Sequence, residues 1–163
     1  MKTLLTTLCL TIAVFLGSVG ASFSADYQKG LTAARSGNYA SALREFRVLA
    51  EQGHASAQYN LGLMYDNGRG VPQDYKESMK WYSKSVEQGH VEAQYNLGVM
   101  YGNGNGVRQD NVYAHMWFDI VASNGDENGA MNRDIVAKKM TREQLAEAQE
   151  LARECLRRKY KGC

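Results

Sequence analysis

The strongest constraint on this chain is a 24-residue segment that occurs twice. Residues 51–74 read EQGHASAQYNLGLMYDNGRGVPQD and residues 87–110 read EQGHVEAQYNLGVMYGNGNGVRQD, so 18 of 24 positions are identical at an offset of 36 residues. A fixed period of about 20–50 residues is typical of repeat architectures, in which each unit buries its apolar face against its neighbours. Features that recur at this offset are therefore first of all parts of a repeated structural unit.

Each unit is expected to fold into two helices joined by a glycine-rich loop. Asp74 and Glu77 have the spacing of a capping box that opens the second helix. Gly62 and Gly98 stand in mid-helix, which predicts that a neighbouring helix approaches too closely for a side chain. The positions that recur are a first-helix core (Ala57, Leu61, Met64 and Tyr65, then Ala93, Leu97, Met100 and Tyr101), N-caps (Asn38, Asp74 and Asp110) and helix-stopping glycines (Gly53, Gly89 and Gly125).

The pattern A-x-x-x-LG-x-x-Y-x-x-G-x-GV-x-x-D, with W[YF] seven residues after the Asp and then EQGH, resembles the Sel-1-like repeat. This repeat is a relative of the tetratricopeptide repeat with a longer loop between its helices. The resemblance implies an all-α fold, a right-handed α-solenoid over residues 25–163. The expected parts are a degenerate tetratricopeptide-like unit (26–53), two repeats (55–89 and 91–125), a terminal half-repeat (127–140) and a capping helix with its tail (141–163).

The final helix does not follow the repeat. Thr141 and Gln144 have the spacing of a second capping box, which places the helix start here. Leu145, Ala148, Ala152 and Cys155 recur at helical spacing and predict an apolar stripe. A solenoid needs its end covered, so we expect this helix to cap the open end of the last repeat.

The N-terminus has the pattern of a secretory signal peptide over residues 1–24. Lys2 precedes an apolar stretch at 4–16, which is followed by small residues. This stretch is shorter than the roughly 20 residues that span a bilayer, so we expect cleavage, after Ala21 or Ser24, and no membrane span afterwards. The expected location is periplasmic or secreted; a retained anchor is the alternative.

Two cysteines remain in the expected mature chain, Cys155 and Cys163. In an oxidising compartment an even pair favours a disulfide. An unbroken helix would separate the two residues by about 12 Å, beyond the reach of a disulfide. The helix is therefore expected to end near Tyr160 and the chain to fold back at Gly162.

Composition and motifs argue against most other functions. Lys and Arg number 19 against 17 Asp and Glu, a balance that shows no nucleic-acid footprint. The glycine-rich strings follow helices, not strands, and no HExxH or Cys/His cluster occurs, so neither a phosphate loop, a metal site nor a cofactor is expected. Some cysteine-rich secreted members of the family carry a β-lactamase label. No serine of the expected mature chain has the S-x-x-K spacing of that activity, so a hydrolase is the weakest alternative.

Three asparagines recur at 36-residue intervals, before the Leu-Gly pair in the two complete repeats. In tetratricopeptide relatives the matching position lines a concave groove, where asparagines bond a ligand's backbone. The resemblance therefore implies a non-enzymatic extracytoplasmic scaffold that binds a peptide or protein segment; a self-assembling envelope protein is the other reading. Alternatively, these amides bond a neighbouring helix. The candidate groove residues are Asn60, Asn96, Asn132, Gln28, Tyr59 and Tyr95.

Overall fold

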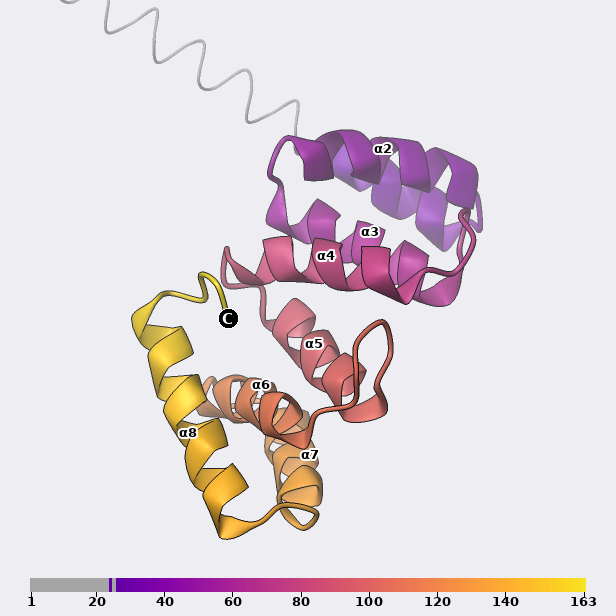
Figure 1. Ribbon diagram of the computed structural model, residues 1–163. Coiled ribbons are helices and arrows are strands. Elements are labelled where there is room, and N and C mark those ends of the chain that lie inside the picture. Colours follow the sequence, from indigo (N-terminus) through magenta and orange to yellow (C-terminus); the bar gives the residue numbers. More distant parts are fainter. Residues whose placement is uncertain (1–23, 25) are drawn as a thin grey trace, which may run out of the picture.

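The computed structural model describes residue 24 and residues 26–163, and the regular structure of this part is α-helical throughout (Figure 1). The signal peptide expected over residues 1–24 lies outside the described residues, apart from its last position. After a helical segment at 26–35 come α2 (Tyr39–Glu51), α3 (Ala55–Asn67), α4 (Tyr75–Val86), α5 (Val91–Asn103), α6 (Asn111–Ser123), α7 (Glu127–Ala137) and α8 (Arg142–Arg157).

The helices stack in chain order as an α-solenoid. Helix α3 packs on α4 and α5 packs on α6, so each complete repeat is one helix pair. Contacts of α2 with α3 and of α4 with α5 join the successive pairs. The helical segment at 26–35 and helices α3, α5 and α7 are the first helices of their units, and α2, α4 and α6 are the second helices.

The buried apolar residues form a core that runs along the solenoid. One cluster joins α2, α3 and Trp81 of α4, and a second joins α4, α5 and α6 around Trp117. A third, smaller cluster joins Phe118 of α6 to Val136 of α7. Each repeat therefore buries its apolar face against the units on both sides, as the 36-residue period predicts.

The mid-helix glycines mark places where helices touch. A Cβ atom on Gly62 would lie 2.6 Å from the ring of Tyr82, and one on Gly98 would lie 2.8 Å from the ring of Phe118. Gly30 faces the ring of Phe46 in the same way. In each unit an aromatic ring of the second helix thus fills the space of the missing side chain, so the expectation of close approach is confirmed.

The helix caps agree with the sequence with one exception. The side chain of Asp74 accepts hydrogen bonds from the backbone N–H groups of Lys76 and Glu77. The second half of the expected capping box is wrong, because the backbone N–H of Asp74 donates to the carbonyl oxygen of Tyr65 at 2.9 Å. The Glu77 carboxylate instead pairs with Lys80 at 3.1 Å. At the start of α8 both halves of the Thr141–Gln144 capping box are present.

Helix α8 covers the second helix of the last complete repeat and leaves the outer face of α7 uncovered. It packs against α6 (Figure 1), with Ala148, Ala152 and Cys155 buried. The physical reason lies in α6, where eight of 13 residues are buried. A helix apolar on nearly all sides needs a further neighbour. On α7, Met131 and Ile135 remain 59% and 45% exposed.

The chain after α8 is held by the expected disulfide, Cys155–Cys163, whose Cα atoms lie 5.6 Å apart. The reversal is built differently from the expectation. Helix α8 already ends at Arg157, and Lys159 and Tyr160 take left-handed φ values of 52° and 65° before Gly162 does so at 68°. This tail returns to the turn between α4 and α5, where Tyr160 lies against Gly89.

Candidate functional site

The first helices place tyrosine and asparagine side chains along one face of successive units, here called the first-helix face. The Nδ2 amide of Asn60 donates to the hydroxyl of Tyr27 in the preceding unit, at 2.9 Å. The Nδ2 amide of Asn132 donates to the hydroxyl of Tyr95 at the same distance. Asn96 is the equivalent residue in the repeat between them and lies near the Tyr59 hydroxyl. Asn60 and Asn132 therefore each tie their helix to the tyrosine of the unit before it.

The second hydrogen on each of two amides is also used within the solenoid. Asn60 donates to the backbone carbonyl of Ser56 at 2.8 Å, and Asn132 donates to that of Asn128 at 2.9 Å. The opposite amide orientation would place two acceptor oxygens against each other. No described residue donates to the Oδ1 atoms of Asn60 and Asn132. These amides can therefore offer the backbone of a ligand an acceptor but no free donor.

Histidine residues support the same tyrosines. His54 stacks on Tyr27 with ring centroids 4.8 Å apart, and His90 stacks on Tyr59 at 4.7 Å. Both histidines occupy N-cap positions, and the third equivalent position is Asp126, whose carboxylate accepts from the backbone N–H of Gly129 at 2.7 Å. The sequence places these histidines just past a helix end but gives no sign of the stacking.

Burial shifts the pKa values of two side chains on this face, Tyr59 and His90. It raises the pKa of the Tyr59 hydroxyl, and the nearby Glu92 carboxylate raises this pKa further, while the polar side chain of Asn96 lowers it. Burial lowers the pKa of His90, against the opposing pull of Glu92, whose Oε2 lies 3.2 Å from His90 Nδ1. Near neutral pH the tyrosine is therefore protonated and the histidine neutral, which leaves Glu92 as the charged group.

A pocket of about 420 Å³ opens on the first-helix face where α3, α5 and α7 meet. It includes three of the six candidate groove residues, Tyr59, Tyr95 and Asn96. Asn60 and Asn132 lie on the same face but outside this pocket, and Gln28 is exposed on the first helical segment. We call it the Tyr59–Tyr95 pocket; its lining residues are Tyr59, Val91, Glu92, Tyr95, Asn96, Asp126 and Asn128.

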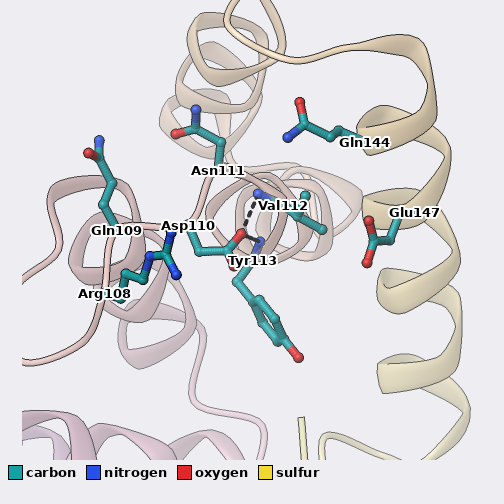
Figure 2. A pocket seen from close by; sticks show the side chains of 8 residues that line it. All are labelled: Arg108, Gln109, Asp110, Asn111, Val112, Tyr113, Gln144 and Glu147. Atoms are coloured by element: carbon teal, nitrogen blue, oxygen red, sulfur yellow. Dashed lines mark hydrogen bonds between the residues drawn. The ribbon is translucent and has the colours of Figure 1, made fainter.

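A second pocket, of about 510 Å³, lies where α8 crosses the start of α6 (Figure 2). Gln144 and Glu147 project from α8 toward Val112 and Tyr113 (Figure 2). Much of its polar lining is already engaged: Asp110 caps α6, and the Gln144 side chain accepts from the backbone N–H of Thr141. The sequence could not indicate this pocket, because the position of α8 does not follow the repeat.

No three His, Cys, Asp or Glu side chains within residues 26–163 are grouped so that they could hold a metal ion. None of the helices in this region has the length and apolar character required to cross a membrane.

The comparisons with known proteins agree with the helical repeat. The family model described as "Sel1 repeat" matches residues 55–90 and 91–126. The curated relatives include DAP3-binding cell death enhancer 1 of Rattus norvegicus and that of Mus musculus, each 38% identical over 45 residues. That match covers 28% of this chain and only 9% of either relative.

Solved structures extend the similarity over most of the chain. A protective antigen of uropathogenic Escherichia coli strains, described as displaying an SLR fold, superposes with a TM-score of 0.80 at 34% identity. The match covers 85% of this chain and 30% of the antigen. A Sel1 repeat protein from Oxalobacter formigenes gives a TM-score of 0.60 at 28% identity, over 82% of this chain and 49% of that one. On its two matched repeats and its helical fold, the chain is a Sel-1-like repeat protein.

Proposed function

We propose that this chain is a non-enzymatic extracytoplasmic scaffold that binds a peptide or protein segment along the first-helix face. Repeats of the Sel1 type generally mediate protein–protein interaction. The observation that carries the proposal is the Tyr59–Tyr95 pocket, because it joins the first helices of three units and exposes two aromatic rings beside an amide. Rings with polar tips are favoured at interfaces, where one end is buried and the other hydrated.

The extracytoplasmic part of the proposal is supported by two features. The N-terminal pattern is that of a signal peptide, and the Cys155–Cys163 disulfide fits an oxidising compartment, where such bonds persist. Size supports the ligand class: a pocket of about 420 Å³ holds one or two side chains of an extended peptide and would leave the rest of the segment along the face.

A peptide-display selection tests the proposal. A random peptide library is selected on the wild-type protein, and the enriched peptides are then titrated against two variants. Val91→Arg fills the pocket with a long side chain, whereas Val48→Arg makes the same change at a half-exposed site on α2. The enriched peptides should lose at least tenfold in affinity for Val91→Arg and bind Val48→Arg as they bind the wild type. Equal binding to both variants would place the ligand elsewhere on the protein.

A second candidate function, self-association, is favoured by one observation. Met131 and Ile135 lie one turn apart on α7 and are among the most exposed large apolar residues that the structure describes. Exposed apolar patches are typical of interfaces between proteins. Size-exclusion chromatography with light scattering decides this case, because a wild-type oligomer should dissociate in the variant Met131→Lys with Ile135→Lys. A monomeric wild type would eliminate it.

A further inference from the structure

The first helices of the two complete repeats differ in charge from α4, the helix that lies between them. Helices α3 and α5 contain no Lys or Arg, and their charged residues are Asp66 and Glu92. The second helix between them, α4, contains three lysines and one glutamate. The first-helix face around the Tyr59–Tyr95 pocket is therefore acidic in a protein whose overall charge is close to balance.

The two carboxylates of the pocket are available to a ligand. The Glu92 side chain is 67% exposed, and its neighbour His90 is neutral near pH 7, so its negative charge is not cancelled there. Asp126 uses one oxygen to cap α7 through Gly129 and has a second oxygen left. None of the seven lining residues is a lysine or an arginine. The pocket therefore has negative charge and no positive charge of its own.

The uncharged groups of the pocket favour the same kind of ligand. Tyr59 and Tyr95 line the pocket, and the π system of a tyrosine ring attracts cations. On the same face, Asn60 donates both of its amide hydrogens to groups within the solenoid, so only its Oδ1 acceptor is left for a ligand. Carboxylates, ring faces and amide oxygens all interact best with a group that donates hydrogen bonds and carries positive charge.

We propose that the Tyr59–Tyr95 pocket binds the ammonium or guanidinium group of a lysine or arginine side chain within a bound peptide. This proposal rests on the proposed groove function and specifies its ligand. Tyr59 and Tyr95 contact the cation and its aliphatic stem, and Glu92 and Asp126 pair with its charge. The side chain of Asn96, which also lines the pocket, accepts a hydrogen bond from the peptide.

The test uses three fluorescein-labelled peptides of about ten residues, with blocked ends, in which alanine alternates with lysine, glutamine or glutamate. Fluorescence anisotropy measures their affinity for the full chain at low salt. The lysine peptide should bind at least tenfold more tightly than the glutamate peptide, with the glutamine peptide between them. Equal affinity for the lysine and glutamate peptides would overturn the proposal.

Two double variants locate the interaction. Glu92→Gln with Asp126→Asn removes both pocket charges, and asparagine at position 126 still serves as an N-cap. Glu147→Gln with Glu150→Gln removes the same charge from the exposed surface of α8. Since each of the two exposed ion pairs contributes about 0.2–1 kcal/mol, the pocket variant should bind the lysine peptide about two- to thirtyfold more weakly, and the α8 variant should bind it like the wild type. Equal losses in both variants would mean that net charge, and not the pocket, attracts the peptide.

The two proposals fail in different ways. If peptides from the library are lost on Val91→Arg but carry no excess of lysine or arginine, and the lysine peptide shows no preference, then the groove stands and the cation proposal is wrong. If the lysine peptide binds wild type and Val91→Arg equally, the cation proposal is wrong whatever the library yields.

Discussion

At the scale of single residues, the glycines that face aromatic rings are sites where any side chain meets an obstacle. Gly62→Ala places a Cβ atom 2.6 Å from the ring of Tyr82, which is fully buried. Overpacking of this kind costs about 1–3 kcal/mol, more than the roughly 1 kcal/mol that alanine gains over glycine in a helix. We therefore expect a lower denaturant midpoint for Gly62→Ala.

Gly102 provides the matched control. It lies in α5, and a Cβ atom there would meet its first neighbour, the Ala114 methyl, at an ordinary 3.7 Å. Gly102→Ala should therefore gain stability, by up to about 1 kcal/mol. If both substitutions shifted the midpoint in the same direction, helix propensity and not the contact with Tyr82 would govern these sites.

The hydrogen bond between Asn60 and Tyr27 joins neighbouring units and should be measurable as a coupling energy. Asn60→Ala and Tyr27→Phe each remove one partner, and the double variant removes both. A hydrogen bond of this kind contributes about 0.5–1.5 kcal/mol, so the double variant should be less destabilised than the sum of the single ones by about that amount. Urea unfolding of the four proteins measures the coupling. Strictly additive losses would show that the bond does not stabilise the solenoid.

Burial of His90 predicts a dependence of stability on pH. Its pKa is lowered in the folded protein, so the unfolded chain takes up the proton first as the pH falls below about 6.5, and stability declines from there toward the lower folded pKa. His90→Asn keeps an N-cap residue without a titrating ring. Between pH 7.5 and pH 5, urea midpoints of the wild type should fall more steeply than those of the variant. Parallel curves would exclude His90 as the source.

At the scale of helices, the disulfide that closes the tail after α8 holds this segment against the turn between α4 and α5. Cys163→Ser opens a loop whose closure stabilises by about 2.5 kcal/mol in the chain-entropy model. The variant should melt earlier than oxidised wild type, and a reductant should lower the wild type to the level of the variant while leaving the variant unchanged. A reductant effect on the variant would point to a different thiol-dependent event.

The helices that obey the 36-residue period were predictable, and the helix that does not was predictable only in part. Asn38, Asp74 and Asp110 cap helices as expected, because a cap depends on residues close in sequence. The start of α8 was predictable from Thr141 for the same reason. The place where α8 packs was not predictable, since it depends on which distant surface has apolar residues to bury. In this structure that surface belongs to α6, most of whose residues are buried.

The candidate groove was predictable to a similar degree. The positions of Tyr59, Tyr95 and Asn96 on one face are a consequence of helical spacing and the period. The bonds of Asn60 and Asn132 are not, because their partners lie 33 and 37 residues away in the preceding unit. The sequence does contain one indication of such bonds, because a tyrosine stands 37 residues, one repeat length plus one, before Asn96 and before Asn132.

At the scale of the whole molecule, the packing of successive helices between the core clusters predicts that the repeats unfold together. Leu61→Ala and Leu97→Ala empty equivalent buried sites in two different repeats and should each cost about 2–5 kcal/mol. Trp81 and Trp117 are buried in two successive clusters. The Trp117→Phe background therefore leaves Trp81 as the fluorescent reporter of one cluster, and the Trp81→Phe background leaves Trp117 as the reporter of the other. Both reporters should give the same denaturant midpoint, lowered by either leucine substitution. Separate midpoints would mean that the repeats unfold independently.

The equivalence of the junctions between units has a consequence for the chain's length. Asn60 joins Tyr27 across one junction as Asn132 joins Tyr95 across another, and within the units Gly62 meets Tyr82 as Gly98 meets Phe118. Duplication of the gene segment for residues 54–89 would therefore place a further unit between two existing ones with both of its borders already complementary. Such a duplication lengthens the first-helix face by one unit of 36 residues and leaves both ends of the solenoid unchanged. Recombination alone can therefore lengthen or shorten the surface that is available for binding.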